Sequence, residues 1–164
     1  RPNLFLTEMT VAGFGTVQKV VFDGKKGETS GMQGSTVLEG EELEEIKSQG
    51  AFFGEADYLS NGYKLTLVAI NMVDGEKAYT LEVDKNGDIS TEYYSVETGL
   101  KLLEEASIES QQGEMTVSQK YSDYRSVDGV MIPYQINISQ GPQQISMTTT
   151  EAKINSGLKK SDFK

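Results

Sequence analysis

The chain contains neither histidine nor cysteine among its 164 residues. Zinc-based activation of water, Ser-His-Asp or Cys-His nucleophilic catalysis and thiol redox chemistry all depend on an imidazole or a thiolate. The sequence therefore predicts no catalytic residues, no metal ligands and no cofactor for this chain alone. Because a protein without cysteine suits a reducing compartment or an envelope protein without disulfides, this absence leaves the location open.

Positive charge is also scarce, with 15 Lys and Arg against 25 Asp and Glu and a net charge of −10. An anionic protein repels nucleic acids and anionic lipid headgroups, so we expect neither as a partner. No apolar run approaches the ~20 residues that span a bilayer, and no leader pattern opens the chain. We expect residues 1–164 to form a single domain, a mature or excised fragment whose targeting segment is missing.

Short alternating segments dominate the hydrophobic pattern, and Asp-Gly or Asn-Gly pairs at 23, 61, 74, 86 and 128 separate them. Such pairs tolerate the positive φ of tight hairpin turns, and strands joined by tight turns are antiparallel. We predict strands near 4–12, 17–23, 63–72, 77–84, 88–95, 99–109, 113–125, 130–139 and 143–154, with a weaker one near 29–37. The predicted fold is mainly β: one strongly curved antiparallel sheet, a half-barrel of about nine or ten strands.

Alternation along the strands assigns side chains to faces of the sheet. Three segments have an apolar set that shares one face: Tyr79, Leu81 and Val83; Ile132, Tyr134, Ile136 and Ile138; and Met115, Val117 and Tyr121, where Gln119 interrupts. We expect a sheet that is apolar on one side and solvated on the other. Residues 65–70 are apolar at every position except one, which predicts that another element covers the second side there.

One short helix is predicted from about Glu41 to Gln49, with a narrow apolar stripe of Leu43 and Ile46. An aromatic segment with Phe52 and Phe53 follows directly. Two interpretations stay open: the helix and this segment form a lid over the apolar face of the sheet, or the helix simply closes the core.

Three other patterns have ordinary structural explanations. Residues 84–88 place oxygen ligands as a calcium loop does, but the glycine is fourth and Ser95 stands where a bidentate Glu belongs, which favours a hairpin turn. The four glutamates within 41–45 are typical of an exposed helix surface rather than of acid–base catalysis. The six methionines suit core filling or an adaptable surface for lipid chains.

Several segments together resemble the lipoprotein-carrier (LolA/LolB-like) superfamily, above all the C-terminal domains of insulinase-type zinc peptidase-like proteins of Bacteroidetes. The resemblance covers nearly the whole chain and rests on residues 4–11, 19–27, 90–100, 121–134 and 155–163, including the pattern Tyr-Tyr-x-x-x-Thr-Gly-Leu from Tyr93 to Leu100. It implies a half-barrel with a helical lid over an apolar concave face, and a place in the periplasm or cell envelope. The peptidase's zinc motif has no counterpart here because the chain has no histidine.

The leading hypothesis is therefore a non-catalytic envelope domain that binds an apolar ligand, an acyl chain or lipoprotein, or an extended peptide on its concave face. We expect an apolar cavity formed by Phe52, Phe53, Leu65, Leu67, Met115 and Tyr134. The alternative is a structural or accessory C-terminal module of a zinc peptidase-like protein, with the parent's peptidase domain as its partner and no ligand of its own. A third hypothesis is a glycan- or peptide-binding domain that uses tyrosines on its convex face.

Overall fold

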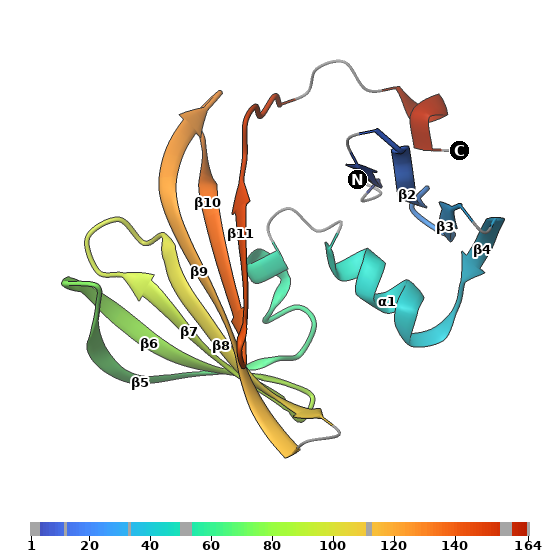
Figure 1. Ribbon diagram of the computed structural model, residues 1–164. Helices are drawn as coiled ribbons and strands as arrows, with labels where there is room; N and C mark the ends of the chain where they lie inside the picture. The colour runs from blue at the N-terminus through green and yellow to red at the C-terminus, as the bar shows by residue number, and fades with distance from the viewer. Residues whose placement is uncertain are drawn as a thin grey trace. The chain divides into compact units, whose positions relative to one another are not determined.

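The computed structural model describes residues 4–11, 13–32, 34–49, 54–110, 113–154 and 159–163. The chain is mainly β with one short α-helix, as predicted (Figure 1). It divides into two compact units, residues 1–57 with 155–164 and residues 58–154. The described strands form two antiparallel sheets, one of four strands and one of seven, where the sequence predicted one sheet. Along the chain, helix α1 and a 3₁₀ helix lie between the last strand of one sheet and the first strand of the other.

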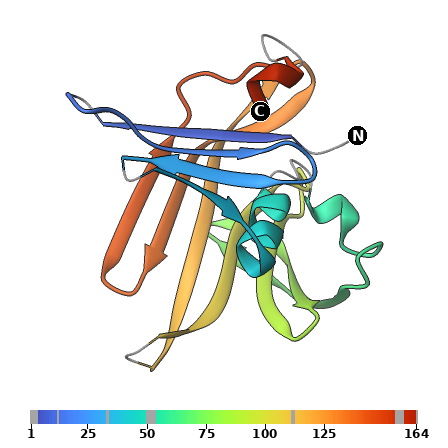
Figure 2. The same cartoon turned by 90° about the vertical axis from the view of Figure 1, so that its right-hand side faces the viewer.

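The four-stranded sheet has the order β1-β2-β3-β4 (blue in Figure 2). Its strands are β1 (Phe5–Val11), β2 (Gly15–Phe22), β3 (Gly27–Gly31) and β4 (Gly34–Leu38), and helix α1 (Gly40–Gln49) follows. The weak strand predicted near 29–37 is thus a hairpin of two strands. Gly34, with a φ of 117°, adopts a conformation in which other residues are strained.

Helix α1 packs against this sheet through Leu43. A Cβ atom on Gly27 would lie 3.1 Å from Leu43 Cδ1 and 3.2 Å from Leu38 Cδ1, so the glycine lets the helix approach the strand closely. Phe22, Leu38 and Phe163 are buried in the same unit. Phe163 belongs to the 3₁₀ helix η2 (Lys160–Phe163), and a second 3₁₀ helix, η1, spans Gly54–Asp57. These contacts favour the interpretation of α1 as a helix that closes a core.

The seven-stranded sheet has the order β11-β10-β9-β8-β7-β6-β5 and is open and curved (Figure 1). Its strands are β5 (Lys64–Val73), β6 (Glu76–Lys85), β7 (Asp88–Ser95), β8 (Lys101–Ser110), β9 (Gly113–Val127), β10 (Val130–Gln140) and β11 (Gln143–Thr148). The order follows the chain because each strand pairs with the next one in sequence.

Three of the predicted turns have positive φ at both central residues, as tight hairpins require: Asp74-Gly75, Asn86-Gly87 and Asp128-Gly129. At the second of these, Asp84 Oδ1 accepts a hydrogen bond of 2.7 Å from the backbone N–H of Gly87. The hairpin interpretation of residues 84–88 is therefore confirmed.

The strand register places the three predicted apolar sets on one face. Val83 pairs with Leu65, Leu81 with Leu67, and Tyr79 with Ile70. On the other half of the sheet, Tyr121 pairs with Ile136, and Ile136 pairs with Met147. We call this side of the seven-stranded sheet the apolar face. The opposite side, the polar face, carries mainly Ser, Thr, Asn, Gln and charged side chains, as in the rows of Thr91 with Glu82 and of Asn137 with Ser146.

Candidate functional site

The apolar face carries a set of large hydrophobic side chains that are exposed rather than packed. Eight of its described strand residues belong to this set: Leu65, Leu67, Ile70, Met72, Tyr79, Ile108, Ile145 and Met147. On the described strands of the polar face, the corresponding residues are Ile89 and Met131; Val68, also exposed, lies at the register shift of β5 and is assigned to neither face. Exposed hydrophobic side chains gathered on one face mark an interaction or ligand-binding site more often than single exposed residues do.

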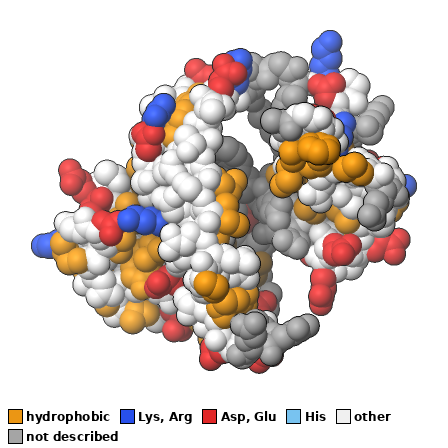
Figure 3. Space-filling model, in the orientation of Figure 1, with side chains coloured by type: hydrophobic (Ala, Val, Ile, Leu, Met, Phe, Trp, Pro, Cys, Tyr) orange, Lys and Arg blue, Asp and Glu red, His pale blue; other side chains and the backbone are white. Residues whose placement is uncertain are grey.

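Seven of these eight side chains form two groups, and Ile108 lies apart from them on β8. One lies on β5 and β6, where Leu67, Ile70 and Met72 are about 60% exposed (60%, 57% and 61%). The other lies on β11, where Ile145 and Met147 stand next to Ile138 and Ile136 of β10. In Figure 3, hydrophobic side chains (orange) gather at the surface over the β5–β7 end of the sheet.

The four described residues of the predicted cavity lie on the apolar face, spread over three strands. Leu65 and Leu67 lie on β5, Met115 on β9 and Tyr134 on β10. Three strands separate β5 from β9, and at about 4.8 Å per strand the two ends are roughly 19 Å apart across the sheet. Phe52 and Phe53 lie outside the described residues.

The exposed fractions of these four predicted cavity residues also differ. Leu67 is exposed, whereas Tyr134 is only 8% exposed, and its ring lies 4.2 Å from the guanidinium carbon of Arg125. Met115 packs near the β10–β11 turn, where its Sδ is 2.9 Å from the position that a Cβ on Gly141 would occupy. Leu65 and Leu67 therefore offer contact surface, whereas Tyr134 and Met115 are already in contact with their own neighbours.

A charged cluster, which we call the central cluster, separates the two apolar groups. It consists of Glu92 on β7 with Lys85, Lys101, Glu104 and the tyrosines 58 and 94. Glu92 is fully buried, and it accepts hydrogen bonds from the hydroxyl of Tyr58 at 2.8 Å and from the hydroxyl of Tyr94. Lys101 Nζ lies 3.1 Å from both Glu92 Oε2 and Glu104 Oε2.

Glu92 is ionised despite its burial. Burial raises the pKa of its carboxyl, but the hydrogen bonds from Tyr94 and Tyr58 and the positive charge of Lys101 outweigh it, so the pKa lies below its usual value. A buried carboxylate with this many partners fixes the segment that carries Tyr58 to the middle of the sheet.

Sequence reasoning missed this cluster. Its signal was present, because Lys85, Glu92, Lys101 and Glu104 occupy positions that face the same way as the apolar sets. The densest run of charged residues in the sequence is instead that of the glutamates in α1, of which Glu41, Glu42 and Glu44 are exposed. A charge at an inward position of an amphipathic strand is the more informative feature.

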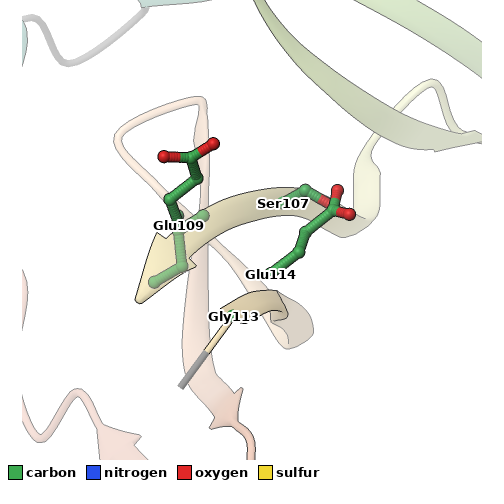
Figure 4. Close-up of a pocket in the computed structure, with 5 residues that line it drawn as sticks. Ser107, Glu109, Gly113 and Glu114 are labelled. Carbon is green, nitrogen blue, oxygen red and sulfur yellow. The ribbon is translucent and has the colours of Figure 1, made fainter. Parts of the chain in front are cut away.

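A separate pocket opens at the β8–β9 hairpin and is lined by Ser107, Ile108, Glu109, Gly113 and Glu114. Figure 4 shows the carboxylates of Glu109 and Glu114 on this hairpin, where the two residues pair directly across the strands. Two facing carboxylates disfavour an apolar or anionic ligand. Across the described residues, no group of three or more acidic side chains is arranged to hold a metal ion.

None of the described helices is both long and apolar enough to cross a membrane. No protein-family model matches the chain, and comparison with curated proteins gives no match. Solved structures do resemble it. A LolA superfamily protein from Nitrosomonas europaea superimposes with a TM-score of 0.65 at 15% identity, covering 99% of this chain and 77% of that one.

Two further structures are similar. A DUF1329 family protein from Desulfovibrio piger gives a TM-score of 0.63 at 13% identity, covering 90% of this chain and 68% of that one. A domain proposed to belong to an outer membrane lipoprotein-sorting protein from Vibrio parahaemolyticus gives 0.59 at 13% identity, covering 98% and 80%. At such low identity the similarity shows the fold alone. The chain has a LolA-like fold.

Proposed function

We propose that this protein is a non-catalytic binding domain of the cell envelope that holds an apolar chain, the acyl chain of a lipid or lipoprotein, on its apolar face. The observation that supports the proposal is the set of eight exposed hydrophobic side chains on one face of the seven-stranded sheet. The LolA-like fold agrees with it, since one of the similar structures is assigned to lipoprotein sorting.

The apolar face can provide micromolar affinity for a hydrocarbon chain. Each buried methylene contributes about 0.8 kcal/mol, so sixteen of them contribute roughly 13 kcal/mol before the cost of immobilising the chain, which is at least about 5 kcal/mol. The remaining net of about 8 kcal/mol corresponds to a dissociation constant of about 1 μM. The apolar group on β5 and β6 is the main contact surface in this proposal, because its side chains are the more exposed.

The central cluster sets a limit on the ligand. The segment that carries Tyr58 already occupies the middle of the sheet over the buried Glu92, so the chain lies along β5 and β6 or along β10 and β11. The cluster is electrically balanced, with Lys85 and Lys101 against Glu92 and Glu104.

The alternative is an accessory module of a zinc peptidase-like protein, which binds no ligand of its own. Any peptidase activity would then belong to another part of the parent protein, since the chain lacks histidine. A glycan site on the polar face is less favoured, because the hydroxyls of Tyr93 and Tyr124 already donate to Glu105 and to the Lys101 carbonyl.

A titration with a fluorescent fatty acid separates these functions. We expect saturable binding at micromolar probe, and we expect Leu67→Asp and Ile70→Asp each to raise the dissociation constant at least about tenfold, which is ~1.4 kcal/mol. Ile89→Asp, on the polar face, is the matched control and leaves binding unchanged. Absence of saturable binding by the wild type, or equal loss in the control, contradicts the proposal.

The predicted part played by Phe52 and Phe53 stays a prediction. If Phe52 contacts the bound chain, Phe52→Ala weakens binding of the same probe and leaves the melting temperature unchanged. If it fills the core instead, the same change costs about 3–5 kcal/mol of stability.

A further inference from the structure

Strand β11 is an edge strand without the usual protection against pairing. It lies at one end of the seven-stranded sheet, pairs with β10 alone among the described strands, and has all six residues exposed. Residues 140–150 contain no charge. The opposite edge strand, β5, begins with Lys64 and has a register shift at Val68. Charges and bulges are two devices that sheet proteins use to block edge-to-edge contact, and β11 has neither; Pro142 precedes the strand and lies outside it.

The direction of the free backbone groups on β11 follows from its pairing with β10. The N–H of Thr149 donates to the carbonyl of Tyr134 at 2.8 Å, so the hydrogen-bonded pairs of this ladder involve the odd-numbered residues of β11. In an antiparallel ladder, residues point their N–H and C=O groups alternately to one side and the other. Gln144, Ser146 and Thr148 therefore point these groups away from the sheet.

These three residues are self-complementary. When a second β11 strand approaches antiparallel with Ser146 opposite its own counterpart, Gln144 stands opposite Thr148 and Thr148 opposite Gln144. Each of these three pairs then exchanges both of its N–H···O=C bonds. In the same register Ile145 stands opposite Met147, so apolar side chains meet apolar ones and polar side chains meet polar ones. A shift by two residues in one direction would bring Thr148 opposite Pro142, which has no N–H to donate. The same shift in the other direction would bring Gln144 opposite Thr150, which lies beyond the end of β11.

We propose that β11 is a dimerisation edge at which two copies of this chain join their seven-stranded sheets around a twofold axis at Ser146. The partner is a second copy because the register closes on itself, as a twofold contact requires. Charge favours this location: each copy carries a net charge of −10, and the contact forms along an uncharged stretch. The twofold also continues the apolar face from one copy to the next through Ile145 and Met147.

The contact is small. Six residues from each copy bury less than the roughly 1,600 Å² of a standard interface, so we expect a dimer that dissociates on dilution. The proposal does not depend on ligand binding and can be tested on the unliganded chain.

The chain has no cysteine, so a single introduced thiol reports the contact directly. Ser146→Cys places two thiols on residues whose Cα atoms lie about 5.5 Å apart across the twofold, within the range that a disulfide bridges. We expect mild oxidation to convert this variant mainly into a covalent dimer. Thr66→Cys, an exposed position on the β5 edge, is the matched control and stays largely monomeric.

Sedimentation of the full chain over a concentration series supplies the second measurement. We expect wild type to show a reversible monomer–dimer equilibrium. Ser146→Lys sets two like charges opposite each other, and we expect it to weaken that dimer at least about tenfold, while Thr66→Lys leaves it unchanged. Circular dichroism melting verifies that each variant is folded. A wild type that stays monomeric, cross-linking of Ser146→Cys no faster than of Thr66→Cys, or an undiminished dimer in folded Ser146→Lys overturns the proposal.

Discussion

Replacement of the buried carboxylate Glu92 by glutamine should destabilise the seven-stranded unit more than any other single charge removal in the central cluster. Glu92 is fully buried, whereas the side chain of Glu104 is 21% exposed. The two phenols that donate to Glu92 would then meet a neutral amide, and Lys101 would lose the charge of Glu92 while keeping Glu104 at 3.1 Å.

The magnitude follows from these contacts. A hydrogen bond to a charged group contributes about 1.5–3 kcal/mol and a neutral one about 0.5–1.5, so the loss is about 1 kcal/mol at each of the two phenols. Weaker pairing of the nearly buried Lys101 adds about 1 kcal/mol, well below the ~3–5 kcal/mol of a fully orphaned buried charge, because Glu104 remains. The expected cost of Glu92→Gln is about 2–4 kcal/mol. Glu104→Gln should cost less than about 1.5 kcal/mol, since Lys101 retains Glu92.

Urea unfolding followed by circular dichroism measures both variants. Hydrogen exchange resolved by peptide shows whether the loss is confined to residues 58–154, as the location of the cluster in that unit requires. Glu92→Gln with wild-type stability, or a loss no larger than that of Glu104→Gln, would refute the reasoning that the buried carboxylate is ionised and paired.

Two further outcomes follow, one from the central cluster and one from the contact between α1 and β3. Because the pKa of Glu92 in the folded state lies below its usual value of 4.5, its contribution to stability is complete above that pH and is lost as the pH falls through the folded pKa. Unfolding free energy should therefore drop more steeply below about pH 4.5 in the wild type than in Glu92→Gln, and parallel curves would contradict this. Gly27→Ala should destabilise the four-stranded unit by about 1–3 kcal/mol, since its Cβ would lie 3.1–3.3 Å from Leu43 and Leu38. Hydrogen exchange in residues 4–49 measures that loss, and protection equal to the wild type would show that Leu43 moves aside freely.

The strands and turns could be predicted because their signals are local. Asp74-Gly75 and Asn86-Gly87 define their hairpins through residues adjacent in sequence, and alternation then assigns each side chain to a face. The hairpin within 27–38 was predicted as one strand because its turn lacks an Asn-Gly or Asp-Gly pair.

Features that depend on distant residues could not be predicted in this way. The sequence predicted Leu65 and Met115 as walls of one cavity, but it could not show that three strands lie between them. Tyr58 and Glu92 are 34 positions apart, and their hydrogen bond depends on how the segment before β5 folds back over the sheet. The division into two sheets likewise depends on whether β4 and β5 pair, which no local pattern decides.

The central claim, that the apolar face binds an acyl chain, is tested most directly by photo-cross-linking. A fatty acid with a diazirine on its chain, activated in the presence of the full chain and mapped by mass spectrometry, reports the residues within contact distance. The account predicts adducts on the exposed residues of the apolar face, Leu67, Ile70 and Met72 before others, and their loss on competition with unlabelled fatty acid. Adducts at Ile89 and Met131 of the polar face, or labelling that competition does not reduce, would contradict it.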